Sequence, residues 1–183
     1  MTPRRVVLTG APCSGKSTAL ESFRDIAIVG PEVASIIIRT CKFMPTYDGP
    51  FERLIYRWQV ALEDYVISEA IDQQVPLVVF DRGRLDPAGF IFDGLQGFQE
   101  ACDIDLETEY AAYDKVIQLA VPTEEVYAQC RANNPARIHD YAESCKYDES
   151  LRKAWEGHPN FVYVDNGGSW DDKLSRVIRE AHG

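Results

Sequence analysis

The chain has 183 residues, of which 45% are hydrophobic, a length and composition typical of one globular domain with a substantial core. Its net charge of −10 and pI near 4.8 argue against a polymeric nucleic-acid partner, because such polymers are held by clustered lysine and arginine side chains. No window approaches the ~20 apolar residues of a membrane span, so membrane insertion is not expected.

The cysteines and the first residues indicate a compartment. The five cysteines are odd in number and irregularly spaced, and no C-x-x-C pair occurs, so neither a zinc site nor a disulfide framework is expected. The amino-terminal residues lack the long apolar stretch and cleavage site of a signal peptide. Reduced thiols in a reducing compartment are the simpler interpretation, and we expect a cytoplasmic protein.

The first predicted elements enclose the most informative motif. Residues 5–9 are an apolar, β-branched run typical of a buried strand, and residues 17–24 have the composition and apolar spacing of a helix. Between them, residues 10–17 read GAPCSGKS and match the phosphate-binding pattern G-x-x-x-x-G-K-S. Because both flanks fit, a chance glycine turn is the less favoured alternative. We expect this segment to bind a nucleoside triphosphate.

Each residue type in this loop has a chemical reason to be there. Gly10 and Gly15 permit backbone angles that let N–H groups converge on phosphate oxygens at the positive end of the next helix. Lys16 adds a charge for the β- and γ-phosphates, and the Ser17 hydroxyl suits a Mg²⁺ ligand. Cys13 is expected to fill space. The predicted nucleotide-binding residues are Gly10, Ala11, Pro12, Cys13, Ser14, Gly15, Lys16, Ser17 and Thr18.

Further apolar runs predict four more strands that alternate with helices. The strands are expected at residues 26–29, 76–80, 115–121 and 161–164, and the helices at 32–38, 51–73, about 139–156 and from 169 onward. Buried strands that alternate with helices predict an α/β fold with three layers, in which helices cover both faces of a five-stranded parallel sheet. We expect a single domain over residues 1–183.

Local sequence patterns predict the buried side of one of these helices and the starts of two others. In the longest one, an apolar stripe at steps of three and four predicts an amphipathic helix; it comprises Leu54, Trp58, Leu62, Tyr65 and Val66. Asp86 followed by proline is typical of a helix N-cap. Residues 169–172 resemble a capping box at the start of the last helix.

Charged residues follow the second and third predicted strands. Ligands of open parallel sheets bind beyond the carboxyl ends of strands, so Asp81 is placed to orient a Mg²⁺ water and Arg82 to reach a phosphoryl oxygen. A solvated Asp–Arg pair is the alternative. Glu32 is expected beside the acceptor hydroxyl, where it could accept a proton, or else it only complements a helix dipole.

Three other groups are weaker candidates for the site. Tyr56, Gln59 and Glu63 share one helix face, which holds a base or sugar or is simply half-exposed, and Gln59 is the preferred substrate contact with Tyr56 beside it. Arg131 and Arg137 flank a turn-like break in a helical lid over about residues 123–156 and would neutralise transition-state charge, unless they are ordinary exposed arginines. Asn166, in the loop after the fifth strand, would wrap the adenine.

These motifs together resemble the NadR-type family of small P-loop ATPases, relatives of the nicotinamide riboside kinase domain. The resemblance is carried, in order along the chain, by GAPCSGKST, PEVAS, VVFDRGRLD and AWEGHPNFVYVDN. It implies a nucleoside-kinase-like fold with strand order 2-3-1-4-5 and an arginine-bearing lid. The chain is also similar to the wider deoxynucleoside and thymidylate kinase group, which implies acceptor-facing roles for Glu32, Asp81 and Arg82 and a lid role for Arg137.

The favoured function is ATP- and Mg²⁺-dependent phosphoryl transfer to a small hydroxyl or phosphate acceptor such as a nucleoside or nucleotide, with GTP as the alternative donor. The competing hypothesis is a regulatory ATPase or GTPase switch that binds a protein or lipid partner. That hypothesis ranks second because no N-K-x-D signature occurs and residues 86–89 match D-x-x-G only formally. A kinase for polynucleotide ends is disfavoured by the acidic charge, and the oligomeric state stays open.

Overall fold

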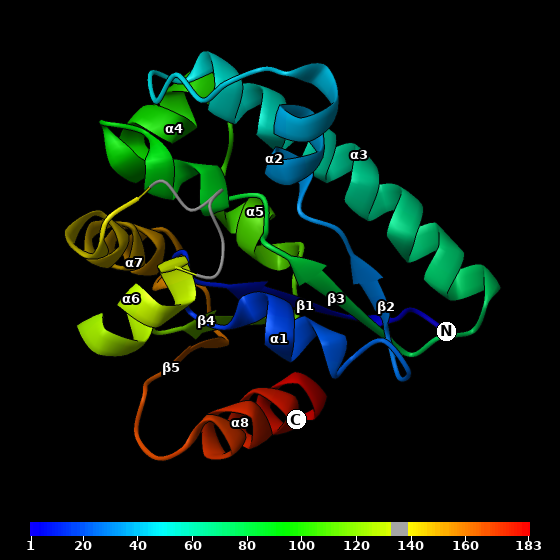
Figure 1. Ribbon diagram of the computed structural model, residues 1–183. Helices are drawn as coiled ribbons and strands as arrows, with labels where there is room; N and C mark the ends of the chain where they lie inside the picture. The colour runs from blue at the N-terminus through cyan, green and yellow to red at the C-terminus, as the bar shows by residue number, and fades with distance from the viewer. Residues whose placement is uncertain (133–138) are drawn as a thin grey trace.

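A five-stranded parallel sheet forms the centre of the computed structural model, which describes residues 1–132 and 139–183 (Figure 1). The strands are β1 (Arg4–Thr9), β2 (Ile28–Gly30), β3 (Leu77–Asp81), β4 (Lys115–Leu119) and β5 (Phe161–Val164). They pair in the order β2-β3-β1-β4-β5, and every neighbouring pair is parallel. The α/β class and the strand order expected from the sequence are confirmed.

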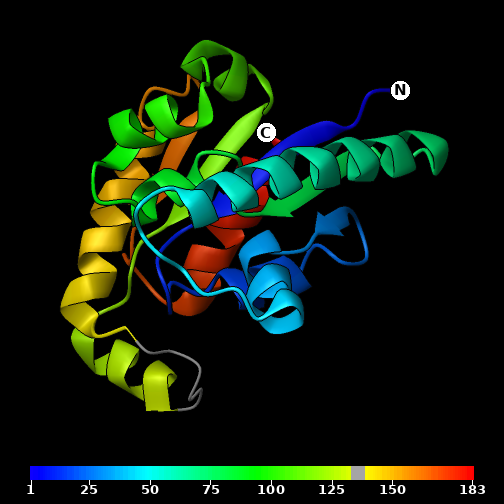
Figure 2. The ribbon, with the colours of Figure 1, turned by 90° about the horizontal axis from the view of Figure 1, so that it is seen from above.

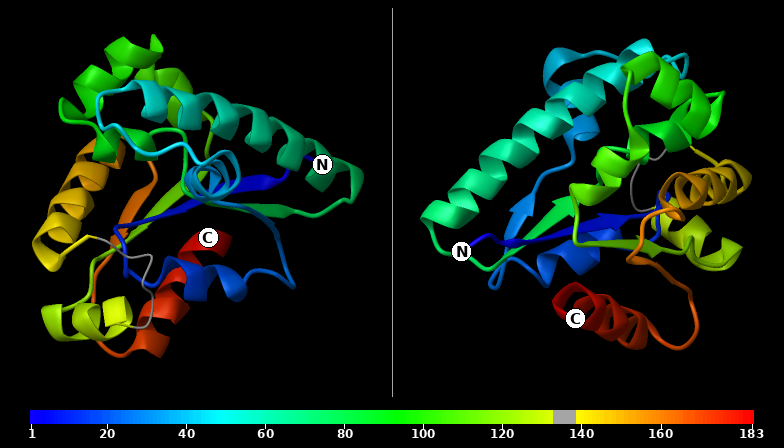
Figure 3. Two further views of the ribbon diagram at one scale, coloured as in Figure 1. Left: turned by 45° about the horizontal axis from the view of Figure 1, so that its top comes forward. Right: turned by 180° about the vertical axis from the view of Figure 1, so that it is seen from behind.

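Helices cover both faces of this sheet (Figures 1 and 3). Helices α1 (Lys16–Glu21) and α8 (Trp170–His182) lie on one face, and α3 (Pro50–Asp72), α4 (Gly94–Cys102), α5 (Leu106–Ala111) and α7 (Tyr141–Trp155) lie on the other. Because side chains alternate along a strand, Val6 and Leu8 pack toward α1 and α8 while Val7 packs toward α3 and α7. No helix within the described ranges combines the length and apolar character needed to cross a membrane.

Shorter elements lie near the carboxyl ends of the strands. After β2 the chain forms α2 (Val33–Ile36) and a π-helical turn (Ile37–Cys41), which pack on the start of α3. After β3 it forms a 3₁₀ helix (Asp86–Phe90), and after β4 it forms α6 (Glu124–Ala132). Seen from above, α6 and α7 follow each other along one side of the molecule (Figure 2). The predicted capping box at Ser169 and Asp172 is confirmed.

The apolar stripe predicted for the longest helix is wrong in part. Trp58 and Tyr65 are 43% and 64% exposed, whereas Gln59 and Glu63, for which a half-exposed face was the alternative, are buried. The reason is that the amino-terminal half of α3 covers a polar part of the molecule, where Gln59 and Glu63 have hydrogen-bond partners, so burial follows the polar face.

The N-cap role predicted for Asp86 is also wrong. Leu85 precedes the 3₁₀ helix, and Asp86 is its first residue. The Asp86 carboxylate turns inward, is 1% exposed and accepts hydrogen bonds from other segments of the chain. Buried donors in the tertiary structure therefore bind the carboxylate that a local pattern assigned to the helix end.

Candidate active site

The phosphate loop (residues 10–18) begins at the carboxyl end of β1 and runs into α1, as the motif predicts. Gly10 and Gly15 have φ angles of +145° and +98°, which side chains with a Cβ resist. A Cβ on Gly10 would lie 2.5 Å from the Leu119 carbonyl oxygen, and one on Gly15 would lie 2.4 Å from the Trp170 ring. Both positions therefore require glycine for conformation and for space.

Lys16 lies against the loop and is surrounded by charged groups. Its Nζ donates to the carbonyl oxygen of Gly10 at 2.8 Å. Burial and the charge of Arg82 together lower its pKa to about 8, although Asp81 and Glu32 act in the opposite direction. The ammonium is thus destabilised as long as no anion accompanies it, which is the electrostatic environment expected of a phosphate-binding lysine.

Arg82 connects three segments at the ends of β1, β2 and β3. Its Nε donates to Glu32 Oε1 at 2.5 Å, and its Nη1 donates to Asp86 Oδ2 at 3.1 Å and to the Gly10 carbonyl at 3.4 Å. The two carboxylates outweigh the effect of burial and raise its pKa above the usual arginine range. The guanidinium also lies over the Phe90 ring, 5.3 Å from its centroid.

Glu32 is ionised and oriented by two partners. Burial opposes ionisation, but Arg82 and Lys16 outweigh it and lower the Glu32 pKa to about 2. The second carboxylate oxygen accepts a hydrogen bond from the Ser35 hydroxyl. The structure therefore brings together Lys16, Glu32 and Arg82, three residues that the sequence places at separate strand ends.

Asp86 is a residue that sequence reasoning missed as part of this site. It accepts hydrogen bonds from Thr9 Oγ1 at 2.6 Å and Arg82 Nη1 at 3.1 Å through one oxygen. Through the other oxygen it accepts from Trp155 Nε1 at 2.8 Å and Gly83 N at 3.3 Å. The available signal was its spacing, four residues after Arg82.

Asp81 has the chemistry of a metal ligand. Burial raises the pKa of its carboxyl, and within the described ranges its buried Oδ1 has no hydrogen-bond partner. In that same part of the chain, no group of three or more histidine, cysteine or carboxylate side chains is arranged to hold a metal alone. An acceptor-only oxygen without a donor fits a Mg²⁺ ion that takes its other ligands from the Ser17 hydroxyl, phosphate and water.

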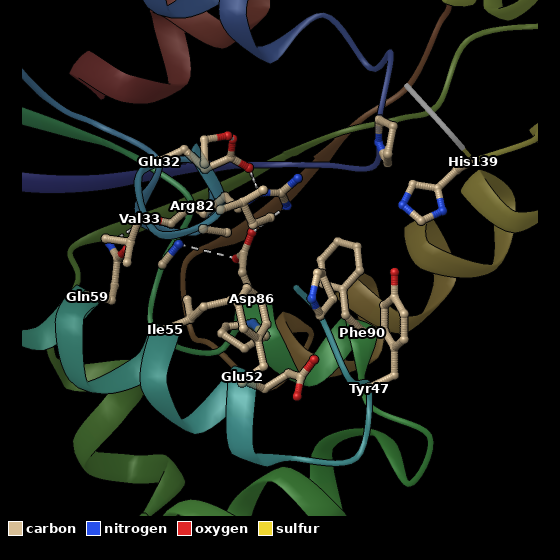
Figure 4. Close-up of a pocket in the computed structure, with 18 residues that line it drawn as sticks. Glu32, Val33, Tyr47, Glu52, Ile55, Gln59, Arg82, Asp86, Phe90 and His139 are labelled. Atoms are coloured by element: carbon tan, nitrogen blue, oxygen red, sulfur yellow. Dashed lines mark hydrogen bonds and ion pairs between the residues drawn. The ribbon is translucent and has the colours of Figure 1, made fainter. Parts of the chain in front are cut away.

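A first cavity of about 270 Å³ opens beside the phosphate loop, next to Pro12 (Figure 4). Glu32, Arg82 and Asp86 lie together on one side of it, and Tyr47, Phe90 and His139 lie on another (Figure 4). Glu52 and Gln59, both on α3, also line it. The cavity thus combines aromatic rings with carboxylates next to the loop.

A buried polar network on α3 supports this cavity. The Gln59 amide donates to Glu63 Oε1 at 2.8 Å and to the Arg82 carbonyl at 3.1 Å. Glu63 also accepts from Arg84 and from the Tyr113 hydroxyl. Tyr56 lies apart from the cavity lining, because its hydroxyl donates to Glu109 at 2.7 Å.

A second cavity of about 540 Å³ lies on another side of the phosphate loop. The phosphate loop contributes Cys13, Ser14, Gly15 and Thr18, the loop before α8 contributes Asn166, and the first residue of α8, Trp170, also lines the cavity. The Asn166 amide donates to the Val121 carbonyl at 2.6 Å, which holds this loop against the end of β4.

Of the two arginines predicted for a lid, the structure describes one. Arg131 is exposed in the last turn of α6. Arg137 lies outside the described residues. The predicted lid over about residues 123–156 includes α6 and α7, together with that undescribed segment.

Comparisons of structure find this fold in solved proteins, among them a kinase. Deoxyadenosine kinase from M. mycoides with bound dATP is 13% identical with a TM-score of 0.56, and the match covers 98% of this chain and 100% of that one. NadR protein in complex with NR is 12% identical with a TM-score of 0.66; the match covers all of this chain, which spans about half (52%) of that one. The expected resemblance is confirmed at the level of the fold.

Comparison of sequences gives the family. A search of curated proteins found no significant match. The phosphate loop, the strand order and the structural neighbours are those of a P-loop NTPase fold. Residues 5–173 match the family model AAA_28, described as an AAA domain, and the chain therefore belongs to this family.

Proposed function

We propose that the protein transfers the γ-phosphoryl group of ATP to a hydroxyl group of a small nucleoside-type acceptor. The observation that carries this proposal is that the phosphate loop lines two cavities, one through Pro12 and the other through Cys13 to Gly15. A donor in the second cavity and an acceptor in the first would therefore meet at the loop. The complexes of the two structural neighbours, one with dATP and one with NR, support a nucleoside ligand.

The donor is assigned to the phosphate loop and the second cavity. Backbone N–H groups of residues 10–18 would bind the phosphates, Lys16 would neutralise them, and Asn166 lies where it could hold the loop around the base. Ser17 and Asp81 would hold Mg²⁺, which when bound neutralises charge on the β- and γ-phosphates. Arg131 and Arg137 would complete the site from the lid, which we assign to α6 and α7 with the segment between them.

The charges around the first cavity select the kind of acceptor. Within the described ranges its lining holds three carboxylates, Glu32, Glu52 and Asp86, and one arginine, Arg82. Two of these carboxylates already pair with that arginine. A phosphorylated acceptor would meet a net negative wall, whereas an uncharged or cationic ring would fit between Tyr47 and Phe90. This favours a nucleoside over a nucleotide.

Glu32 would act on the acceptor hydroxyl. A carboxylate with a pKa of about 2 is ionised at neutral pH and accepts a hydrogen bond from the hydroxyl without first losing a proton. It is a weak base, so the hydroxyl proton would move to it only late, when the bond to phosphorus has begun to form. Arg82 would balance the negative charge on the Glu32 carboxylate and on the attacking oxygen of the acceptor.

Substitution of Lys16 tests the proposal. Purified protein is incubated with MgATP and a panel of nucleosides, and ADP release is measured with and without each nucleoside. We expect release that depends on one acceptor, and a loss of more than about 100-fold in Lys16→Ala with unchanged thermal unfolding. Lys153→Ala, which removes an exposed lysine paired with Glu149, is the matched control.

Two results would overturn the proposal. Unchanged turnover in Lys16→Ala would remove the phosphate loop from the reaction. ATP hydrolysis that no nucleoside or nucleotide stimulates would instead favour the regulatory switch.

A further inference from the structure

Lys173 occupies a position that is unfavourable for a lysine on grounds of stability alone. It is the fourth residue of α8 and is 5% exposed. The amino-terminal end of a helix carries partial positive charge, which repels a nearby ammonium group. Within the described ranges, no carboxylate forms an ion pair with Lys173 to offset this cost.

The contacts of Lys173 join three segments around the second cavity. Its Nζ donates to Asn166 Oδ1 at 2.7 Å, to the Ala120 carbonyl at 2.9 Å and to the Ser14 carbonyl at 3.3 Å. These acceptors belong to the loop before α8, the end of β4 and the phosphate loop. All three are neutral, so they satisfy the donors of Lys173 without neutralising its charge.

The surroundings confirm that this charge is costly. The pKa of Lys173 is lowered to about 8, chiefly by burial and also by Arg176, and the nearby charges of Asp148 and Asp165 offset this only in part. The same side chain lines the second cavity together with Ser14, Gly15 and Asn166. An anion bound along the phosphate loop would add negative charge beside Lys173, for which the described part of the chain provides no carboxylate at ion-pair distance.

We propose that Lys173 is a nucleotide-binding residue, whose ammonium group holds the phosphate loop at Ser14 and stabilises the bound polyphosphate through its uncompensated charge. The inference rests on the proposed function, because it requires a polyphosphate in the loop. It assigns to the last helix of the chain a part of the donor site that the phosphate-binding motif does not contain.

The test separates this role from a structural one. Lys173→Met removes the charge while keeping a similar side-chain volume, and Lys173→Gln keeps a donor without charge. Calorimetry is carried out with MgATP and with magnesium tripolyphosphate, which has no base. We expect both variants to bind both ligands roughly tenfold more weakly, because the bound polyphosphate loses the attraction of one nearby positive charge. Their thermal unfolding should shift to lower temperature while both variants stay folded, because the Ser14 and Ala120 carbonyls and Asn166 lose the ammonium donor.

Lys115→Met is the matched control. Lys115 contacts the same helix but has a carboxylate partner, Glu180, at 2.7 Å. The Lys115→Met variant should bind both MgATP and magnesium tripolyphosphate with wild-type affinity.

Each result decides between the two proposals. Wild-type protein that binds neither ligand overturns the proposed function. Wild-type binding with equal affinity in the Lys173 variants overturns only the present inference. Unfolding of both variants shows a structural lysine, and a loss for MgATP without a loss for tripolyphosphate shows a role toward the base; either result contradicts the charge role.

Discussion

The positive charge of Arg82 is balanced by two carboxylates, Glu32 and Asp86. Both carboxylates line the first cavity, but Glu32 is partly exposed whereas Asp86 is buried. If an acceptor hydroxyl competes for Glu32, Asp86 keeps the guanidinium in place. Arg82 would therefore keep one carboxylate partner, and its position, if Glu32 takes part in the proposed reaction.

The ionisation of Glu32 contributes to stability in a way that depends on pH. Its pKa in the folded protein is about 2, below the ordinary value of 4.5, so this contribution is present above pH 4.5 and is lost as the pH falls toward 2. We expect Glu32→Gln to be about 3 kcal/mol less stable than wild type at pH 7 and about 1 kcal/mol less stable at pH 3. Urea unfolding at both pH values measures the difference.

Glu149→Gln is the control for this prediction. Glu149 pairs with Lys153 at 2.8 Å on the surface, where such pairs contribute little. A constant difference between wild type and Glu32→Gln from pH 7 to pH 3 would contradict the assigned ionisation.

Site residues that lie next to a motif or a strand end could be predicted from the sequence. Site residues whose role depends on hydrogen bonds to distant parts of the chain could not. Glu32 and Arg82 follow apolar strands, so topology alone brings them to one edge. Asp86 and Lys173 gain their roles from Trp155, Thr9 and Ser14, which lie far away along the chain. Local patterns therefore describe Asp86 as a helix cap and leave Lys173 unnoticed.

Among the elements around the site, helix α7 is joined to it by a hydrogen bond from Trp155 to Asp86. Trp155, the last residue of α7, is fully buried and donates to Asp86, which in turn holds Arg82. The 3₁₀ helix that carries Asp86 packs against α7 at Gly89, where a Cβ would lie 2.8 Å from Leu151. A change in the position of α7 would therefore move the Asp86 carboxylate and, through it, the Arg82 guanidinium.

Trp155→Phe tests this connection. The substitution keeps an aromatic ring in the core but removes the indole N–H, so Asp86 loses one donor. We expect turnover to fall several-fold with MgATP affinity nearly unchanged, and the free energy of unfolding to fall by about 2–3 kcal/mol, because both the hydrogen bond and part of the core packing are lost. Steady-state kinetics and urea unfolding measure both effects.

The exposed Trp58 provides the control. Trp58→Phe should alter neither turnover nor unfolding. Equal effects of the two substitutions on turnover would show that the hydrogen bond to Asp86 is not involved.

The long helix α3 shows why its buried face could not be predicted. Periodicity finds the helix and nearly its limits, Pro50–Asp72. It assumes that the buried side is apolar, whereas Glu52, Gln59 and Glu63 are all buried here because the helix spans both the core and a polar cavity. Hydrophobic spacing reports burial against a core only.

In the molecule as a whole, the phosphate loop contributes residues to two separate cavities. Pro12 lines one and its neighbour Cys13 lines the other. Under the proposed function, donor and acceptor would therefore be bound at the same time. Direct transfer between two bound substrates is the reaction that this arrangement favours.

This arrangement makes a kinetic prediction for the active acceptor found in the nucleoside panel. Initial rates measured against acceptor at several MgATP concentrations should give reciprocal plots that intersect, because both substrates are bound when the phosphoryl group moves. Parallel lines, together with acceptor-independent labelling of the protein by γ-³²P-ATP, would indicate a phosphorylated enzyme and contradict direct transfer.

The Trp170 ring, pressed against Gly15, has a practical consequence. It is 37% exposed and lines the second cavity, so ligand entry would change the polarity around an indole. The chain contains two other tryptophans, Trp58 and Trp155, and replacing them by phenylalanine would leave Trp170 as the single tryptophan, which can be excited at wavelengths that tyrosine does not absorb. Titrations could then be followed by intrinsic fluorescence, without a dye or a labelled nucleotide.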